Sequence, residues 1–274
     1  MFSKLLKHDF KANAGLLSLL AGCALGVGCV AAVILRLLTT HWEKLMAQDS
    51  FVLLLIPAFL FLLFAYLAIV FYSAASQYIL LFRFYKSRFT DEGYLMFTLP
   101  VKTSHIFLSG AVNLLIWSLI SLIVVCASLA IAIGLGPVWT PEALEEVRWV
   151  FSDMQLGAAD AIPPGYVFCT ILYALSAVVY AVITPLSAVV LGATVAKKHK
   201  VLAIIGVMIG LSMVTSTVTG IISGISQFLI ITSAKNMFLY MKLTPLLSGI
   251  FLLGMSVGGY FLSVYLMKRR LNLP

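Results

Sequence analysis

Residues 106–135 read IFLSGAVNLLIWSLISLIVVCASLAIAIGL and include no charged side chain. A helix needs roughly 20 apolar residues to cross a bilayer core of about 30 Å, so this stretch can span a membrane with some tilt. Five other stretches of the chain are similarly long and apolar, at 14–35, 51–82, 164–195, 201–231 and 244–267. The sequence therefore predicts an all-α polytopic membrane protein with six transmembrane helices in a domain covering 14–267.

The composition indicates the same fold class. Hydrophobic residues make up 62% of the 274 residues and charged residues only 10%, whereas a soluble domain carries about 25% charged residues. The sequence lacks the alternation that is typical of an outer-membrane β-barrel. The apolar run at 14–35 is longer than the core of a signal peptide, and no clear small-x-small cleavage site follows it. We therefore expect it to stay in place as the first transmembrane helix.

The distribution of lysine and arginine predicts how the chain crosses the membrane. If both termini are inside, thirteen of the 18 basic residues fall in inner segments and most acidic residues fall in outer ones. Basic loops stay on the cytoplasmic side of a membrane. We therefore expect a multi-pass protein of the bacterial plasma membrane with both termini cytoplasmic. The net charge of +8 then reflects topology and contact with anionic lipids, and the sequence offers no basic soluble face for nucleic acid.

Two short segments outside the spans are predicted to be amphipathic helices. Residues 1–13 place Phe2, Phe10 and two leucines on one helical face and lysines on the other, which is typical of a helix lying on the inner leaflet. Residues 140–157 begin with Thr140-Pro141, a common helix start, and belong to the long outer segment 136–163. This outer helix is either a lid over an exit path or a connector. Residues 268–274 form a cytoplasmic tail.

A stripe of small polar residues follows one face of the fifth predicted span. Ser212, Ser216, Thr219 and Ser223 recur at steps of three or four residues. The glycine pairs Gly206/Gly210 and Gly220/Gly224 belong to the same span, and similar pairs occur at Gly22/Gly26 and Gly254/Gly258. Small and polar residues mark either close packing between membrane helices or the wall of a hydrated path. The sequence leaves both interpretations open.

No pattern in the sequence predicts catalytic, cofactor-binding or metal-ligating residues. The predicted spans carry ionisable residues only at their ends, so the usual ion site of a coupled transporter is missing. The four histidines do not cluster, the four cysteines form no CxxC pair, and there is no GxxxxGK[ST] phosphate loop. We therefore do not expect an enzyme, and any ATP and Mg²⁺ would be bound by another subunit.

The longest polar interruption on the predicted inner side is 83–105, reading RFYKSRFTDEGYLMFTLPVKTSH. Thr90 can cap a short helix that begins at Asp91-Glu92 and ends before Pro100. Its exposed aromatic residues, flanked by basic ones, suit insertion into a groove on another protein. The alternative is an interfacial helix that dips into lipid.

This loop resembles the membrane subunits of ABC transporters of the ABC-2 exporter class from Gram-positive bacteria. Such permeases carry a stretch of the form YKS-x-F-x-DEGYL-x-x-TLPV, matched here by Tyr85-Lys86-Ser87, Phe89, residues 91–95 and Thr98-Leu99-Pro100-Val101. The resemblance implies that residues 86–100, within the cytoplasmic coupling loop 83–105, contain the coupling helix that docks on a separate ATPase subunit. It implies contacts through Arg88, Asp91, Glu92, Tyr94, Leu95 and Lys102.

The resemblance also implies a permease dimer, with a second copy or a paralogue, in which the first and fifth spans lie near the interface. The outer loop of this class usually follows the fifth span, whereas here the larger outer segment follows the third. The expected function is export or extraction of an amphiphilic substrate, such as a peptide, an antimicrobial or a lipid. The alternative is a non-transporting membrane module that acts as a sensor or assembly partner.

Overall fold

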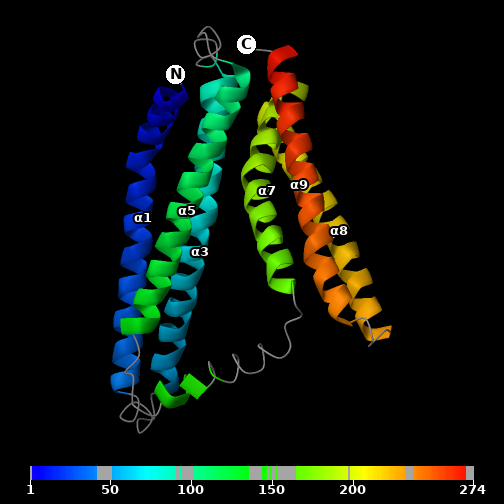
Figure 1. The fold of residues 1–274 in the computed structure, drawn as a ribbon. Coiled ribbons are helices and arrows are strands. Elements are labelled where there is room, and N and C mark those ends of the chain that lie inside the picture. Colours follow the sequence, from blue (N-terminus) through cyan, green and yellow to red (C-terminus); the bar gives the residue numbers. More distant parts are fainter. Residues whose placement is uncertain are drawn as a thin grey trace. The chain divides into compact units, whose positions relative to one another are not determined.

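The computed structural model describes residues 2–41, 51–90, 93, 102–135, 144–146, 148, 149, 152, 165–196, 198–232 and 237–269. Six long helices contain most of them (Figure 1): α1 (Phe2–Thr40), α3 (Phe51–Phe89), α5 (Thr103–Leu135), α7 (Tyr166–Val195), α8 (Lys200–Thr232) and α9 (Met237–Arg269). All six are long and apolar enough to cross a membrane. The predicted all-α fold with six spans is confirmed, and the described positions within the predicted outer helix, 144–146, 148, 149 and 152, are helical as well.

The predicted interfacial segment and the first span form one continuous helix, α1, of 39 residues. No proline interrupts residues 2–14, so the backbone continues from one segment into the other. At about 1.5 Å per residue such a helix is roughly 58 Å long, nearly twice the thickness of a bilayer core. The basic, amphipathic first turns of α1 therefore extend beyond the hydrocarbon region without a break in the helix.

Residues 3–80 and 112–152 form one compact unit, in which α1 and α5 run in the same direction and α3 runs against them. Alanines fill its centre, where Ala31, Ala65 and Ala132 of the three helices pack together. A Cβ atom added to Gly28 would lie 2.9 Å from the carbonyl oxygen of Ser128. The backbones of α1 and α5 therefore approach closely, as small residues permit in membrane bundles.

Hydrogen bonds between side chains also join α3 to α5 in this unit. The amide nitrogen of Gln77 donates to the hydroxyl of Ser118 at 2.8 Å, and the hydroxyls of Ser76 and Ser121 are 3.4 Å apart. Polar contacts of this kind stabilise association of helices in an apolar medium, where no water competes for the donors. They fix the register of α3 against α5.

The second compact unit contains residues 81–111 and 153–274. In it α7 packs against both α8 and α9, and α9 runs in the same direction as α7. Glycine again sets the closest approaches. A Cβ atom added to Gly249 would lie 3.3 Å from the Cα atom of Tyr173, and one added to Gly259 would lie 3.1 Å from the hydroxyl of Ser187. These two contacts place α9 directly on α7.

The four glycine pairs that the sequence singled out do not make these contacts. A Cβ atom added at any of Gly22, Gly26, Gly206, Gly210, Gly220, Gly224, Gly254 and Gly258 would meet no described atom within 4 Å. Each pair therefore faces open space in this single chain. Close approach depends on what lies opposite a glycine, which spacing within one helix does not reveal.

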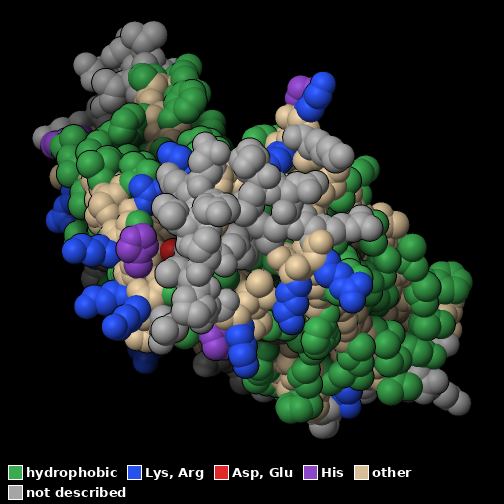
Figure 2. All heavy atoms as spheres, turned by 90° about the horizontal axis from the view of Figure 1, so that it is seen from above, with side chains coloured by type: hydrophobic (Ala, Val, Ile, Leu, Met, Phe, Trp, Pro, Cys, Tyr) green, Lys and Arg blue, Asp and Glu red, His purple; other side chains and the backbone are tan. Residues whose placement is uncertain are grey.

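Basic side chains lie at one end of the helices. The last turn of α3 carries Lys86 and Arg88, and the last turn of α9 carries Lys268 and Arg269. Figure 2 looks onto the molecule from this end and shows lysine and arginine side chains on the face. Cations at a helix C-terminus interact favourably with the helix dipole, so these basic residues stabilise the C-terminal ends of α3 and α9.

Gly192→Ala is expected to destabilise the protein by about 1–3 kcal/mol, the usual cost of overpacking. The added Cβ would lie 2.5 Å from the backbone nitrogen and Cα of Ile204, so α7 and α8 would have to separate. The matched control is Gly206→Ala in α8, where the new methyl group would meet nothing within 4 Å. Thermal unfolding of the two purified variants in detergent gives the comparison. Equal midpoints would contradict the close contact between α7 and α8.

Candidate functional site: a polar groove between α7, α8 and α9

A groove of about 640 Å³ opens between the last three helices of the second unit. Nine of its thirteen lining residues have polar side chains: Tyr166, Thr170 and Tyr173 from α7, Ser216, Thr219, Ser223 and Gln227 from α8, and Thr244 and Ser248 from α9. The other four are Gly220, Ile230, Met241 and Pro245. So many polar side chains between helices that are apolar enough to span a membrane are unusual, because burying polar groups in hydrocarbon is costly.

Only part of the polar stripe of α8 lines this groove. Ser216, Thr219 and Ser223 line the groove, whereas Ser212 does not. Ser212 belongs to the same face of the helix but lies one turn beyond Ser216, where the groove ends. Neighbouring residues serve packing instead, since Thr215 is buried and shares a hydrogen bond of 2.7 Å with the hydroxyl of Tyr180. On α8, groove-lining residues and a residue that packs against α7 therefore alternate along one helix, and a hydrated path stays a prediction.

Hydroxyl groups of the α8 wall donate their protons to their own helix. Ser216 donates to the carbonyl of Met213 at 3.0 Å, Thr219 to that of Thr215 at 2.8 Å, and Ser223 to that of Gly220 at 2.9 Å. A hydroxyl that donates in this way still has lone pairs that can accept. This wall consequently presents hydrogen-bond acceptors to whatever occupies the groove.

Donors come from the other walls and from Gln227. Among the residues that the structure describes, the side chains of Gln227, Tyr166, Tyr173 and Ser248 share no hydrogen bond with another residue. Ser248 is only 6% exposed, yet it lines the groove. A hydroxyl or amide group at the wall of a groove can exchange hydrogen bonds with water or with a bound molecule. These side chains are therefore available to donate to water or to a ligand in the groove.

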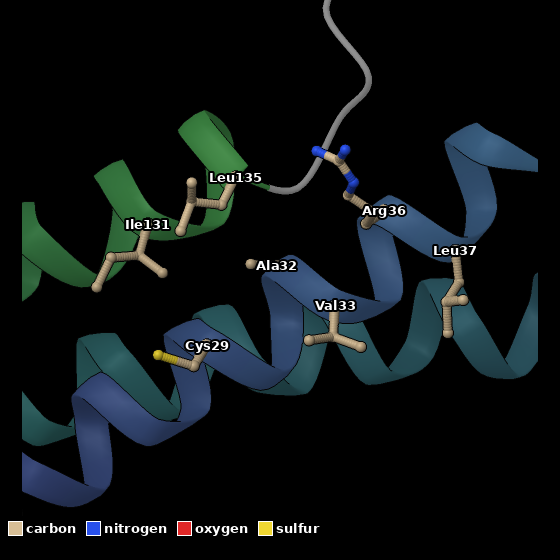
Figure 3. A pocket seen from close by; sticks show the side chains of 7 residues that line it. All are labelled: Cys29, Ala32, Val33, Arg36, Leu37, Ile131 and Leu135. Carbon is tan, nitrogen blue, oxygen red and sulfur yellow. The ribbon is translucent and has the colours of Figure 1, made fainter.

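A second, smaller cavity of about 310 Å³ lies between α1 and α5 and has a different character (Figure 3). Its lining consists of Cys29, Ala32, Val33, Arg36 and Leu37 from α1 with Ile131 and Leu135 from α5. Apart from the thiol of Cys29 and the guanidinium of Arg36, the surface is hydrocarbon. It offers a polar molecule few hydrogen-bonding groups, so the groove of α7, α8 and α9 is the better candidate for selective binding.

Arg88, a predicted ATPase contact, is held inside the protein. Its side chain is 2% exposed, with one guanidinium nitrogen donating to the hydroxyl of Ser109 at 3.1 Å and another to that of Ser87 at 2.9 Å. The guanidinium carbon lies 4.5 Å from the ring centroid of Phe84. Arg88 thus fastens the end of α3 to the start of α5, which gives it a positioning role at the base of the predicted coupling loop.

The rest of the predicted contact lies mostly outside the described residues. This applies to Asp91, Glu92, Tyr94 and Leu95, whereas Lys102 is exposed directly before α5. The hydroxyl of Thr90 donates back to the carbonyl of Lys86, so its described bond belongs to the end of α3 rather than to a following helix. A Cβ atom at Gly93 would clash with the carbonyl of Arg88. Only glycine fits where the chain passes this close to α3.

Sequence reasoning found one wall of the groove and missed the other two. The α8 stripe stood out because its polar residues recur over several turns, whereas α7 and α9 contribute isolated residues among apolar ones. One signal was available: Ser248, Ser256 and Ser263 recur every seven or eight residues in α9, and all three are buried. Such a spacing marks one helical face and would have indicated that α9 contacts another helix there.

Four cysteines, Cys23, Cys29, Cys126 and Cys169, are present as free thiols. Within the described ranges, no three His, Cys, Asp or Glu side chains lie close enough together to hold a metal ion. Comparisons with profiles of known protein families, with curated proteins and with solved structures found no match. Function must therefore be inferred from the groove, the helix ends and the motif at 85–101.

Proposed function

We propose that this chain is the permease subunit of an ABC transporter of the ABC-2 exporter class, which moves an amphiphilic substrate by means of a separate ATPase subunit. The single observation that carries the proposal is the groove with polar side chains between α7, α8 and α9, three of the six helices that are apolar enough to cross a membrane. Polar side chains from three helices line this groove, while most of its surface is apolar, so the lining suits a molecule that has both polar and apolar parts. An amphiphile uses both kinds of surface, because Ile230, Met241 and Pro245 adjoin the polar residues.

The motif in the loop between α3 and α5 supports an external source of energy. The sequence contains no phosphate loop of its own, and residues 85–101 resemble the coupling segment of ABC-2 permeases. ATP and Mg²⁺ would be bound by the partner. Because Arg88 links the end of α3 to Ser109 of α5, a displacement of this loop by an ATPase would move both helices together. Such rigid linkage is what conversion of nucleotide binding into helix movement requires.

The proposed assembly contains two permease chains, either copies of this chain or this chain and a paralogue. The open glycine pairs support it. Gly22 and Gly26 of α1 and Gly206 and Gly210 of α8, which lie outside the groove, have no described atom within 4 Å of an added Cβ, so these small-residue surfaces are available to a second chain. Small-xxx-small pairs let membrane helices approach closely.

Affinity purification of the chain from native membranes tests the proposal. The expected result is stoichiometric recovery of an ATPase together with the chain, and hydrolysis by the complex that rises when amphiphilic compounds are added. Recovery of the chain with no ATPase, under conditions that preserve other membrane complexes, would favour the alternative of a non-transporting sensor or assembly module.

The proposed orientation, in a bacterial plasma membrane with both termini cytoplasmic, predicts opposite labelling of two exposed positions. His41 follows α1, and Lys198 lies between α7 and α8. In a variant whose four cysteines are replaced by alanine, His41→Cys should react with an impermeant maleimide in intact cells, and Lys198→Cys only after lysis. The physical reason is the excess of basic residues on the Lys198 side. The reverse pattern would invert the topology.

A further inference from the structure

We infer that the groove between α7, α8 and α9 binds an uncharged, polyhydroxylated head group, such as the sugar of a glycolipid, and excludes charged head groups. The inference rests on the proposed function for the purpose of the groove, but binding itself is measurable without an ATPase. It is carried by the chemistry of the lining, which contains hydroxyls, an amide and two tyrosine rings.

Charge is the first criterion. None of the thirteen described lining residues is a lysine, arginine, histidine, aspartate or glutamate. Lys242 follows Met241 in the sequence but does not line the groove. An ion moved from water into a site of low dielectric constant needs an opposite charge to compensate its lost hydration. A phosphate, sulfate or quaternary ammonium group would find no such partner among these side chains.

Hydrogen-bonding capacity is the second criterion. Ser216, Thr219 and Ser223 offer acceptor lone pairs because their protons are donated within α8. Gln227 and Ser248 offer donors that no other described residue uses. A sugar hydroxyl both donates and accepts, so one polyol can satisfy both walls at once.

Size and shape are compatible with a sugar head group. The volume of about 640 Å³ lies within the range of roughly 300–1,000 Å³ that is usual for small-molecule sites. Tyr166 and Tyr173 supply amphipathic rings on the α7 side, which combine an apolar face with a hydroxyl. The apolar lining residues Ile230 and Met241 provide a surface along which an alkyl chain can leave toward the lipid.

The test uses the full chain in lipid nanodiscs and a photoactivatable analogue of dodecyl maltoside. Cross-linked peptides are expected from α7, α8 and α9, and unlabelled dodecyl maltoside should compete for them. Dodecyl sulfate and dodecyltrimethylammonium carry the same alkyl chain but a charged head group. They should compete at least about tenfold less well, because an affinity loss of about 1.4 kcal/mol corresponds to a factor of ten. Equal competition by either charged compound would overturn the inference, as would labelling confined to other helices.

Two single substitutions in α8 test whether the side chains of the groove account for the binding. Gln227→Leu removes two amide donors at similar size and should weaken competition by dodecyl maltoside about tenfold. Ser212→Leu adds a leucine to the same helical face beyond the groove and should leave it unchanged. If dodecyl maltoside competed equally well in the Gln227→Leu variant and in the wild type, the inference would be overturned. ATPase recovery without sugar binding would refute this inference alone, and sugar binding without an ATPase would refute only the proposed function.

Discussion

A chain carrying Tyr94→Ala together with Leu95→Ala is expected to insert into the membrane normally and to lose its ATPase. In the proposed coupling helix these two residues form the apolar centre of the contact. Truncation of an aromatic anchor in a well-packed interface typically costs about 2 kcal/mol or more, which corresponds to a decrease in affinity of roughly 30-fold. The measurement is the amount of ATPase that co-purifies with the variant at equal permease recovery.

The matched control removes the same two side-chain types at exposed positions far from the predicted loop in the sequence. Tyr66 and Leu67 of α3 form a Tyr-Leu pair with both side chains exposed, at 54% and 49%. Tyr66→Ala with Leu67→Ala should leave ATPase recovery at the wild-type level. If the Tyr94/Leu95 variant also retained its ATPase and its stimulated hydrolysis, the loop would be an interfacial connector, and the proposed contact between this loop and an ATPase would be wrong.

Hydropathy located the spans well but not the ends of the helices. The predicted span 51–82 is part of a helix that continues to Phe89, and the predicted span 14–35 belongs to one that begins at Phe2 and ends at Thr40. Hydropathy reports which residues tolerate hydrocarbon, whereas a helix continues until its backbone is interrupted. α3 ends at Phe89, and Gly93 lies so close to the Arg88 carbonyl that an added Cβ atom would clash with it.

The close helix contacts could not be predicted from glycine spacing, because each depends on a residue in another helix. Gly28 allows α1 to approach α5 closely because it lies opposite Ser128. Gly259 likewise faces Ser187, and an added Cβ at Gly249 would lie 3.4 Å from the hydroxyl of Ser176. A small residue on both sides is what allows two backbones to approach. One sequence without its fold gives only one side of each pair.

Arg88 shows the same limitation for charged residues. From sequence it resembled an exposed cation flanking an interaction helix, and its direct contact with an ATPase stays a prediction. The structure buries its side chain between Phe84 and Ser109. Long basic side chains carry an apolar stem and a planar donor group, so they can serve inside a protein as readily as on its surface. Sequence position alone does not distinguish the two uses.

Ser216→Leu together with Thr219→Leu is expected to abolish the response of the transporter to its substrates. Both side chains line the groove, and two leucines would fill part of it while removing two hydrogen-bond acceptors. Overpacking a preformed site costs about 1–3 kcal/mol, and 1.4 kcal/mol already corresponds to roughly a tenfold loss. The measurement is stimulation of ATP hydrolysis by amphiphiles in proteoliposomes that contain the permease with its ATPase.

The control places the same substitutions on the same helix outside the groove. Ser212→Leu with Thr217→Leu changes two exposed residues that do not line it, so basal and stimulated hydrolysis should both match the wild type. In the groove variant basal hydrolysis should persist, because the coupling loop is untouched, while stimulation falls at least about tenfold. Full stimulation in the groove variant would show that substrates take another route, and the polar wall of α8 would then be a packing surface for a second chain.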